Sequence, residues 1–404
     1  MTTTQNMTGV ELEIARWLSA FALQSDDEGI LLEGFAERLA AAGLPVARIA
    51  SGSEVFHPII DARGFRWYPG LGIERTDFAR DAVEDEDWPR SPVYHMREND
   101  LTELRRTVGR SYRQGEFPML DRFVHEGATD YIAFLISFAR EATLGAVPGV
   151  FISFNGTRPG GLEPAEVDLL RRLSVHFAHA YKTISTLTTS RVLMSTYLGA
   201  DPSRRVLDGA IVRGRAETVQ AVLWYSDLEG FTRIADTEGK DQLLGLLNEY
   251  ADCLVSTIAA HDGEVLKFMG DGILAMFPLG KEGSCARALS AAAAALESID
   301  SLSGRRAEAS LPRADIHLAL HVGEVLYGNI GSRDRLDFTV VGPAVNEVAR
   351  IEAMCRSLDQ RVVTSAAFAE AAGPCRSRLV SLGRYALRGV RRPEELFTID
   401  PDAC

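Results

Sequence analysis

The sequence predicts an α+β fold with a mainly antiparallel sheet in its C-terminal half, and three observations lead to this class. Helix-like and strand-like apolar runs alternate between residues 218 and 399, with frequent hairpin signals between them. One of these signals is an Asp-Gly turn at residues 271–272 that joins two apolar runs. The 404 residues exceed one ordinary core, so at least one further domain is expected. Helices layered on an antiparallel sheet satisfy these features.

Residues 1–163 are expected to form a first domain that mixes helices with strands. Apolar residues at helical spacing predict one helix near residues 12–23 and a second near residues 30–42, which Gly43 and Pro45 end. Three apolar runs are typical of strands: 46–50, 131–138 and 150–154.

Residues 164–215 are expected to form a helical linker. A long helix is predicted from Pro164 to Tyr197, since proline suits a first helical turn. Its apolar positions repeat at spacings of three and four, which is typical of a short coiled coil between two chains. An alternative is that the first half of this helix packs on its own domain. The positions of the repeat are Leu170, Leu173, Phe177, Ala180, Ile184, Leu187, Arg191 and Met194.

Residues 216–404 are expected to form the C-terminal domain. Its strands are predicted at 220–225, on both sides of the turn at 269–272, at 316–321, 325–330, 338–341, 361–364 and 395–399. The two strands at 316–330 are expected to be separated at Gly323. Helices are predicted over 243–258, 287–299 and 344–354.

Composition excludes several classes of protein. A net charge of −13 argues against a general nucleic-acid binder, which usually carries a basic face. Five scattered cysteines without a C-x-x-C pair fit reduced thiols. The first residues lack a signal-peptide pattern, and no window approaches 18 consecutive apolar residues. A cytoplasmic protein without a membrane span is therefore expected.

Two aspartates are the first candidates for chemistry. Asp227 ends an apolar strand, and Asp271 lies at a hairpin tip between two glycines. Carboxylates on neighbouring strand ends can hold divalent cations. Mg²⁺ is commonly bound by one or two carboxylates, and substrate phosphates complete its coordination. Two such metals can activate an attacking oxygen and stabilise a leaving one. Taken alone, each aspartate is more typical of a simple turn.

The sequence motifs around these aspartates resemble those of a known family. YSDLEGFT at residues 225–232 resembles the F-S-D-[I/L]-x-G-F-T signature of the class III adenylate and guanylate cyclases, and KFMGDG at 267–272 resembles their K-x-x-G-D-G hairpin. DFTVVG at 337–342, followed by VN at 345–346 and AR at 349–350, resembles the third block. LRG at 387–389 resembles the closing L-K-G block. The resemblance implies a ferredoxin-like catalytic domain with a mainly antiparallel sheet.

The resemblance also implies a metal and phosphate site. Asp227 and Asp271 would hold two divalent metal ions, Mg²⁺ or Mn²⁺, and the carbonyl of Leu228 would complete one metal's shell. The amides of Glu229, Gly230, Phe231 and Thr232 would face the phosphates, since the loop leads into a helix N-terminus. Arg388 stands where the family usually has a lysine that holds the terminal phosphates.

The same resemblance assigns the nucleoside contacts. Lys267 and Thr339 would bind the base, and both favour adenine because lysine only donates hydrogen bonds, whereas guanylate cyclases usually carry glutamate at this position. Asn346 would orient the ribose. Arg350, four residues later on one helix face, would stabilise charge on the α-phosphate. The implied activity is adenylate cyclase, which converts ATP to 3′,5′-cyclic AMP and pyrophosphate.

Some residues depart from the family pattern, and two rival functions stay open. His317 stands at a position that often carries a phosphate-binding arginine, and Pro343 replaces an acidic or amide residue. Asp337 is a lesser candidate for the base contact, with a salt bridge equally plausible. The rivals are a guanylate cyclase, which Lys267 disfavours, and a non-catalytic nucleotide-binding regulator, which typically lacks a metal aspartate or the arginine.

The family's active sites imply a homodimer, because the metal aspartates and the residues that bind the base and stabilise the transition state come from opposite subunits. The N-terminal domain resembles a GAF-type sensor in one segment, VFISF at residues 150–154, followed by a glycine-rich turn and a long exit helix. A small molecule or a partner protein would be its ligand; a purely structural dimerisation domain is the alternative.

Overall fold

The computed structural model describes residues 2–80, 87–139, 149–280, 283–388 and 393–400. Contacts divide the chain into two compact units, residues 1–193 and 194–404. Each unit has its own sheet and its own hydrophobic core.

The N-terminal unit contains five helices and six strands among the described residues. In chain order they are α1 (Thr2–Ala22), α2 (Glu28–Ala41), β1 (Val46–Glu54), β2 (Ile60–Tyr68), β3 (Gly72–Ala79), α3 (Pro92–Glu98), β4 (Glu103–Thr107), α4 (Pro118–His125), β5 (Asp130–Ser137), β6 (Gly149–Gly156) and α5 (Pro164–Leu198). The predicted helices and strands of this region are all confirmed. The strands β2, β3 and β4 and the short helices α3 and α4 were not predicted.

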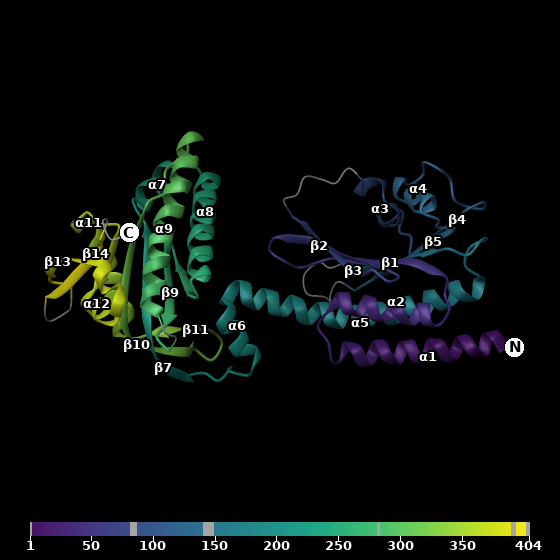
Figure 1. The fold of residues 1–404 in the computed structure, drawn as a ribbon, viewed down its shortest axis with the longest axis horizontal. Helices are drawn as coiled ribbons and strands as arrows, with labels where there is room; N and C mark the ends of the chain where they lie inside the picture. Colours follow the sequence, from purple (N-terminus) through teal and green to yellow (C-terminus); the bar gives the residue numbers. More distant parts are fainter. Residues whose placement is uncertain (1, 81–86, 140–148, 281–282, 389–392, 401–404) are drawn as a thin grey trace. The chain divides into compact units, whose positions relative to one another are not determined.

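The strands of this unit form one antiparallel sheet in the order β3-β2-β1-β6-β5-β4. Helices α1, α2 and α5 cover one face, and the short helices α3 and α4 lie on the other (Figure 1). Asp27 begins α2 as its N-cap, because its carboxylate accepts hydrogen bonds from Gly29 N at 2.8 Å and Ile30 N at 3.0 Å. The sheet therefore has a large apolar core on one side and a smaller layer on the other.

Helix α5 is a single helix of 35 residues, as predicted. Its apolar positions through Ile184 are buried in the core of its own unit. The prediction that these positions pair two chains is therefore wrong, because one chain already buries them. Leu187 is 41% exposed, and Arg191 forms an ion pair with Asp26 of the same unit.

The C-terminal unit contains seven helices that begin within it and eight strands among the described residues. They are α6 (Ala200–Leu207), β7 (Ala216–Leu228), α7 (Phe231–Thr237), α8 (Lys240–Ala260), β8 (Glu264–Met269), β9 (Gly272–Pro278), α9 (Ser284–Glu308), β10 (Ile316–Gly331), β11 (Leu336–Val341), α10 (Pro343–Glu352), α11 (Cys355–Leu358), β12 (Val362–Ser365), α12 (Ala366–Ala371), β13 (Leu379–Tyr385) and β14 (Glu394–Ile399).

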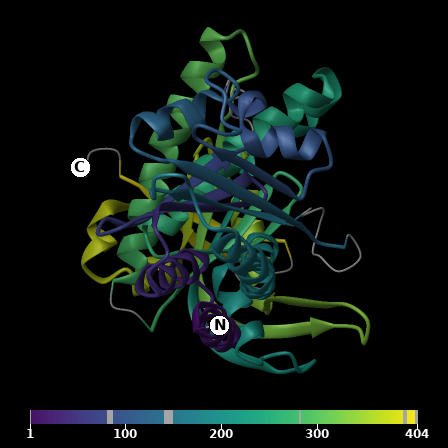
Figure 2. The same cartoon turned by 90° about the vertical axis from the view of Figure 1, so that its right-hand side faces the viewer.

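Its strands form one sheet in the order β13-β14-β12-β10-β7-β9-β8, with β11 paired to β10. Every pair is antiparallel except β10 with β12. The predicted mainly antiparallel α+β class is confirmed. Helices α8, α9 and α12 pack on one face, and α10 and α11 pack on the other. Figure 2 shows the β10–β11 pair extending past the rest of the sheet.

The expected break at Gly323 does not exist, since β10 runs through it as one strand of 16 residues. Gly323 allows a close approach between β10 and helix α10, and does not form a turn. A Cβ atom on Gly323 would lie 2.4 Å from the Cβ of Ala344 on α10, which real Cβ atoms do not tolerate. Glycine therefore lets α10 pack directly against β10.

Helix α8 reaches the length and mean hydropathy of a membrane span, with 21 residues and a value of 1.2. Core helices of globular proteins can meet the same criteria. One face of α8, formed by Leu246, Tyr250, Leu254 and Ile258, is buried in the core that it shares with α9. We therefore interpret α8 as a core helix.

Candidate active site

The two candidate metal ligands lie side by side in one chain. Asp227 is near the end of the central strand β7, and Asp271 lies in the tight turn between β8 and β9. Gly270 supplies the left-handed conformation of this turn, with φ of 72°. Because β7 pairs with β9 from Ser226 to Ile273 onward, the turn brings the Asp271 carboxyl group within hydrogen-bonding reach of Asp227.

Asp227 lies in an unfavourable electrostatic position for an anion. Burial and the hydrogen bond and negative charge of Asp271 raise its pKa from 3.8 to about 7. The Leu228 N–H donates to the same carboxyl group and acts in the opposite direction. Either a proton or a cation at this pair is therefore favoured over two bare carboxylates.

A third carboxylate belongs to this cluster and was not predicted. Glu352, at the end of α10, has its pKa raised to about 7 by burial and by the charge of Asp271. The signal in the sequence was its position four residues after the buried Val348, on a helical stripe that is otherwise apolar. Among the described residues, however, no group of three or more His, Cys, Asp or Glu side chains is spaced to hold a metal ion.

The expected phosphate loop follows Asp227. The side chain of Leu228 is buried in the core, and Gly230 precedes the short helix α7, which begins at Phe231 and Thr232. The Glu229 amide donates to the Asp315 carbonyl oxygen at 2.9 Å, so in this state it is engaged inside the chain. The remaining amides of the loop precede or open the helix, where N–H groups lack helical partners.

His317 lies directly opposite Asp227 on the neighbouring strand β10. Burial lowers its pKa, although Glu229 at 3.9 Å acts in the opposite direction. His317 is therefore mostly neutral near pH 7 and does not replace the positive charge of an arginine at this position.

Lys267 and Asp337, two of the residues considered for the base contact, form an ion pair. Lys267 Nζ lies 2.7 Å from Asp337 Oδ2, and both side chains are about half exposed at 46% and 48%. The hydrogen bond from Lys267 lowers the pKa of Asp337. Thr339 lies two residues further along β11, on the same face of the strand as Asp337.

Asn346, the candidate for the ribose contact, and Arg350, the candidate for transition-state stabilisation, lie on α10, which Pro343 opens in its first turn. Asn346 is exposed and Arg350 is half-buried. Among the described residues, no carboxylate lies within 4.0 Å of the Arg350 guanidinium group. The intervening Glu347 instead points back to the sheet, where it contacts His321 Nε2 at 3.1 Å.

The last candidate, Arg388, is exposed in a turn after the buried Leu387. Gly389, which completes the predicted L-K-G-like block, lies outside the described residues. The structure thus groups the candidates into an acidic cluster, the Lys267–Asp337 ion pair with Thr339 nearby on β11, and a helix carrying Asn346 and Arg350.

Comparison with known proteins agrees with this arrangement. Residues 215–400 match the family model described as the adenylate and guanylate cyclase catalytic domain. Adenylate cyclase 1 of Rhizobium meliloti (strain 1021) is 28% identical over 174 residues, which are 42% of this chain and 26% of that protein. Adenylate cyclase of Anabaena cylindrica is 30% identical over 147 residues, 35% of this chain and 29% of that protein. The matches thus span under a third of these relatives.

A solved structure of a bacterial light-regulated adenylyl cyclase is 26% identical to this chain, covering 46% of it and 91% of that chain, with a TM-score of 0.40. The match to the family model covers most of the C-terminal unit, and the two adenylate cyclase relatives agree with it. Residues 215–400 therefore form a class III adenylate/guanylate cyclase catalytic domain.

Proposed function

We propose that this chain is an adenylate cyclase that converts ATP to 3′,5′-cyclic AMP and pyrophosphate. The observation that carries this proposal is the contact between Asp227 and Asp271; burial, together with the hydrogen bond and charge of Asp271, raises the pKa of Asp227 to about 7. Two carboxylates so arranged fit divalent cations, because Mg²⁺ is commonly held by one or two carboxylates together with substrate phosphates. When bound, such ions lower the pKa of the attacking hydroxyl and neutralise the leaving phosphates.

The base-binding residues favour adenine. The ammonium group of Lys267 can only donate, which suits a ring nitrogen of adenine, and the Thr339 hydroxyl can accept from the adenine amino group. Lys267 is held by Asp337 at 2.7 Å on the surface. Such an exposed ion pair contributes only about 0–1 kcal/mol, so a base can displace it readily.

The helix α10 would supply the remaining chemistry. Asn346 would orient the ribose so that its 3′-oxygen faces the α-phosphorus. Arg350 would donate to the α-phosphate oxygens in the transition state, for which its planar fork is well suited. Arg388 would hold the terminal phosphates. No side chain of the cluster is assigned as a general base, and that role is left to water or substrate.

We further propose that the enzyme is a homodimer with two shared sites. Each chain would contribute Asp227 and Asp271 to one site, and Lys267, Asn346 and Arg350 to the other. The match of residues 215–400 to the cyclase catalytic domain supports this arrangement, because the family's active sites are formed between two subunits. A monomer would then lack a complete site.

The N-terminal unit is proposed to regulate this reaction as a GAF-like sensor. Its six-stranded antiparallel sheet, with long helices on one face and short helices on the other, supports the proposal. Helix α5 leads from this unit into the catalytic one. A role in dimerisation alone is the alternative.

One assay separates the proposed activity from its rivals. The purified full chain is incubated with ATP or GTP and with Mg²⁺ or Mn²⁺, and products are identified by mass. Cyclic AMP from ATP supports the proposal, and cyclic GMP from GTP alone would establish the guanylate cyclase. Nucleotide binding without either product would identify a non-catalytic regulator.

The shared site is tested by mixing two inactive variants. Asp227→Ala and Arg350→Ala chains are each expected to be inactive, whereas mixed dimers regain one intact site. Activity should therefore reappear when the two are combined and should peak at equal amounts. No recovery at any ratio, with mixed dimers verified, would exclude sites built from two chains.

The proposed base selection is tested by Lys267→Glu. The glutamate would accept from guanine N–H groups and repel the acceptor nitrogen of adenine, so the ratio of kcat/KM for ATP over GTP should fall by about tenfold to 100-fold. Lys240→Glu, a change in the first turn of helix α8, should leave this ratio unaltered. An unchanged ratio in Lys267→Glu would show that this residue does not contact the base.

A further inference from the structure

A row of polar side chains crosses the sheet of the N-terminal unit beneath α4. Arg48 on β1 lies opposite Asn155 on β6, which lies opposite Tyr131 on β5. Residues directly opposite each other in antiparallel strands share one face, so the three side chains form a row. Phe123 of α4 covers it, with its ring centre 4.6 Å from the Arg48 guanidinium carbon and its ring stacked on Tyr131 at 6.4 Å.

These three side chains are buried, yet each has a polar atom without a partner. Arg48 is 7% exposed, and Tyr131 and Asn155 are each 3% exposed. Among the described residues, Arg48 Nη1 and Asn155 Oδ1 have no hydrogen-bond partner. The Tyr131 hydroxyl has no described partner within 3.5 Å, but Ser153 lies near enough to act on its pKa, so Tyr131 is the least isolated of the three. The hydrogen bond found for the Arg48 side chain runs from Nε to the Tyr68 hydroxyl at 3.3 Å, and no described carboxylate lies within 4.0 Å.

A buried guanidinium without a counter-charge is unfavourable, since burial of an unpaired ion costs several kcal/mol. The same unit neutralises its other inward-facing arginines. Arg63 meets the buried Glu28 at 3.5 Å, and Arg105 meets the buried Asp130 at 2.6 Å. Within the described part of this unit, Arg48 thus lacks the kind of anionic partner that Arg63 and Arg105 have.

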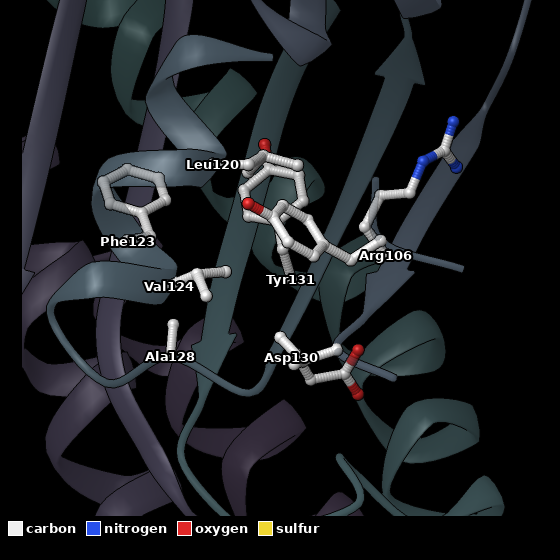
Figure 3. A pocket seen from close by; sticks show the side chains of 9 residues that line it. Arg106, Leu120, Phe123, Val124, Ala128, Asp130 and Tyr131 are labelled. Carbon is white, nitrogen blue, oxygen red and sulfur yellow. The ribbon is translucent and has the colours of Figure 1, made fainter. Parts of the chain in front are cut away.

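A cavity of about 10 Å³ shares Phe123 and Tyr131 with this row. Figure 3 shows Phe123, Val124 and Tyr131 around it, while the guanidinium group of Arg106 extends away from Phe123. Arg106 is paired with Glu116 and is therefore not the group in need of a partner. Such a cavity holds about one water molecule, so a larger guest must displace α4.

We propose that Arg48, Tyr131 and Asn155 form a binding site for a small anionic metabolite whose carboxylate or phosphate group pairs with Arg48. The planar fork of arginine matches both groups. Burial raises the pKa of Tyr131 to about 12, so its hydroxyl stays protonated and can donate. The Asn155 side-chain amide has both an acceptor oxygen and an NH₂ donor, and a half-turn of the amide directs the donor toward an anion. A regulatory role for this site rests on the sensor function proposed above. Anion binding itself is measured without cyclase activity, so the two proposals can fail separately.

Calorimetric titration of the full chain tests the site with acetate, pyruvate and inorganic phosphate, and with neutral acetamide as the control. The matched variants are Arg48→Met and Arg172→Met. Arg172 lies on α5, on the other face of the sheet, and is exposed and paired with Glu11. A chain of net charge −13 has no general affinity for anions, which makes saturable binding informative.

At least one anion should bind with a Kd of about 1 mM or tighter, and Arg48→Met should weaken it about 30-fold or more, the factor expected when one partner of a buried charge pair is removed. Arg172→Met should bind as the wild type does. Binding of acetate and pyruvate alone identifies a carboxylate ligand, and binding of phosphate alone identifies a phosphate ligand. Binding retained in Arg48→Met, or binding of none of the three anions at about 10 mM, overturns the proposal.

Two further measurements guard against a misfolded variant. Arg48→Lys keeps the charge but loses the fork, so it should bind more weakly than the wild type and more tightly than Arg48→Met. Without anion, Arg48→Met should raise the unfolding temperature of the N-terminal unit, because it removes an unpaired buried charge. If instead it lowers this temperature while anion binding persists, Arg48 is a structural residue satisfied by water.

Discussion

Asp130 in the N-terminal unit is buried and Asp227 in the C-terminal unit is half-buried, and the two carboxylates have opposite surroundings. Asp130 accepts hydrogen bonds from Arg105 at 2.6 Å, the Thr107 hydroxyl at 2.8 Å and the Leu162 amide at 2.9 Å. Asp227 faces Asp271 and lies near Glu352. A buried carboxylate with a full set of donors belongs to the fold, whereas one that faces other carboxylates marks a place for a cation.

The largest effect on activity is expected from removing the negative charge of Asp227. Asp227→Asn should lower the cyclase rate on the order of 10³-fold or more, because a neutral amide is a poor ligand for a catalytic cation. Its unfolding temperature without metal should be unchanged or higher, since repulsion from Asp271 is relieved. The control is Asp236→Asn, an exposed position on α7. Full activity in Asp227→Asn would remove the metal role from this residue.

The well-paired aspartate should show the reverse behaviour. Asp130→Ala leaves Arg105 without its buried partner and should lower the free energy of unfolding of the N-terminal unit by about 3–5 kcal/mol, measured by urea denaturation. The double variant Asp130→Leu with Arg105→Met should lose much less. Equal losses in both would show that the packing, and not the ion pair, is responsible.

The pH dependence expected for Asp227 sharpens the comparison. Because the pKa of Asp227 is raised in the folded chain, its protonated form contributes stability that is present below pH 3.8 and is lost as the pH rises through about 7. Mn²⁺ must displace the same proton, so its affinity should rise about tenfold per pH unit below about pH 7.

Calorimetric titration with Mn²⁺ at several pH values between 5 and 8 measures this dependence. Glu352, whose pKa is raised similarly, can add to the slope. In Asp227→Asn the part of the slope that belongs to Asp227 should disappear. A flat Mn²⁺ affinity between pH 5 and 7 in the wild type would contradict the raised pKa.

The smallest effect on stability is expected on helix α5. Leu187 is 41% exposed, so Leu187→Glu should change the free energy of unfolding by only about 0.5 kcal/mol. If two chains pair through this part of the helix, the variant should nevertheless dissociate at higher protein concentration and lose activity on dilution. Light scattering with chromatography measures the mass. Val175→Glu, 58% exposed on the same helix, should not affect assembly; an unaltered dimer in Leu187→Glu would exclude this seam.

Local patterns in the sequence predicted much of the fold. The helices α1, α2 and α5 and the β8–β9 hairpin follow from apolar spacing and turn residues alone. The failures arose where tertiary contacts decide. Gly323 was interpreted as a break because a chain pattern does not show that Ala344 lies against it. The seam of α5 was assigned to a second chain because periodicity does not identify the surface on which a helix packs.

The candidate site divides in the same way. Asp227 and Asp271 were identified as candidate metal ligands because the glycines and apolar strand residues around them form recognisable sequence motifs. Glu352 was missed because its relation to Asp271 depends on how α10 lies on the sheet. Arg48 and Tyr131 were also missed, since residues 83 positions apart become neighbours only through the register of three strands.

The contact between Gly323 and Ala344 places a limit on how helix α10 can vary. Ala344 is in the first turn of α10, two residues before Asn346 and six before Arg350. Any side chain added at Gly323 would therefore lift both of these groups from the sheet together. The absence of one methyl group on a strand thus fixes the height of two candidate site residues on the helix above it.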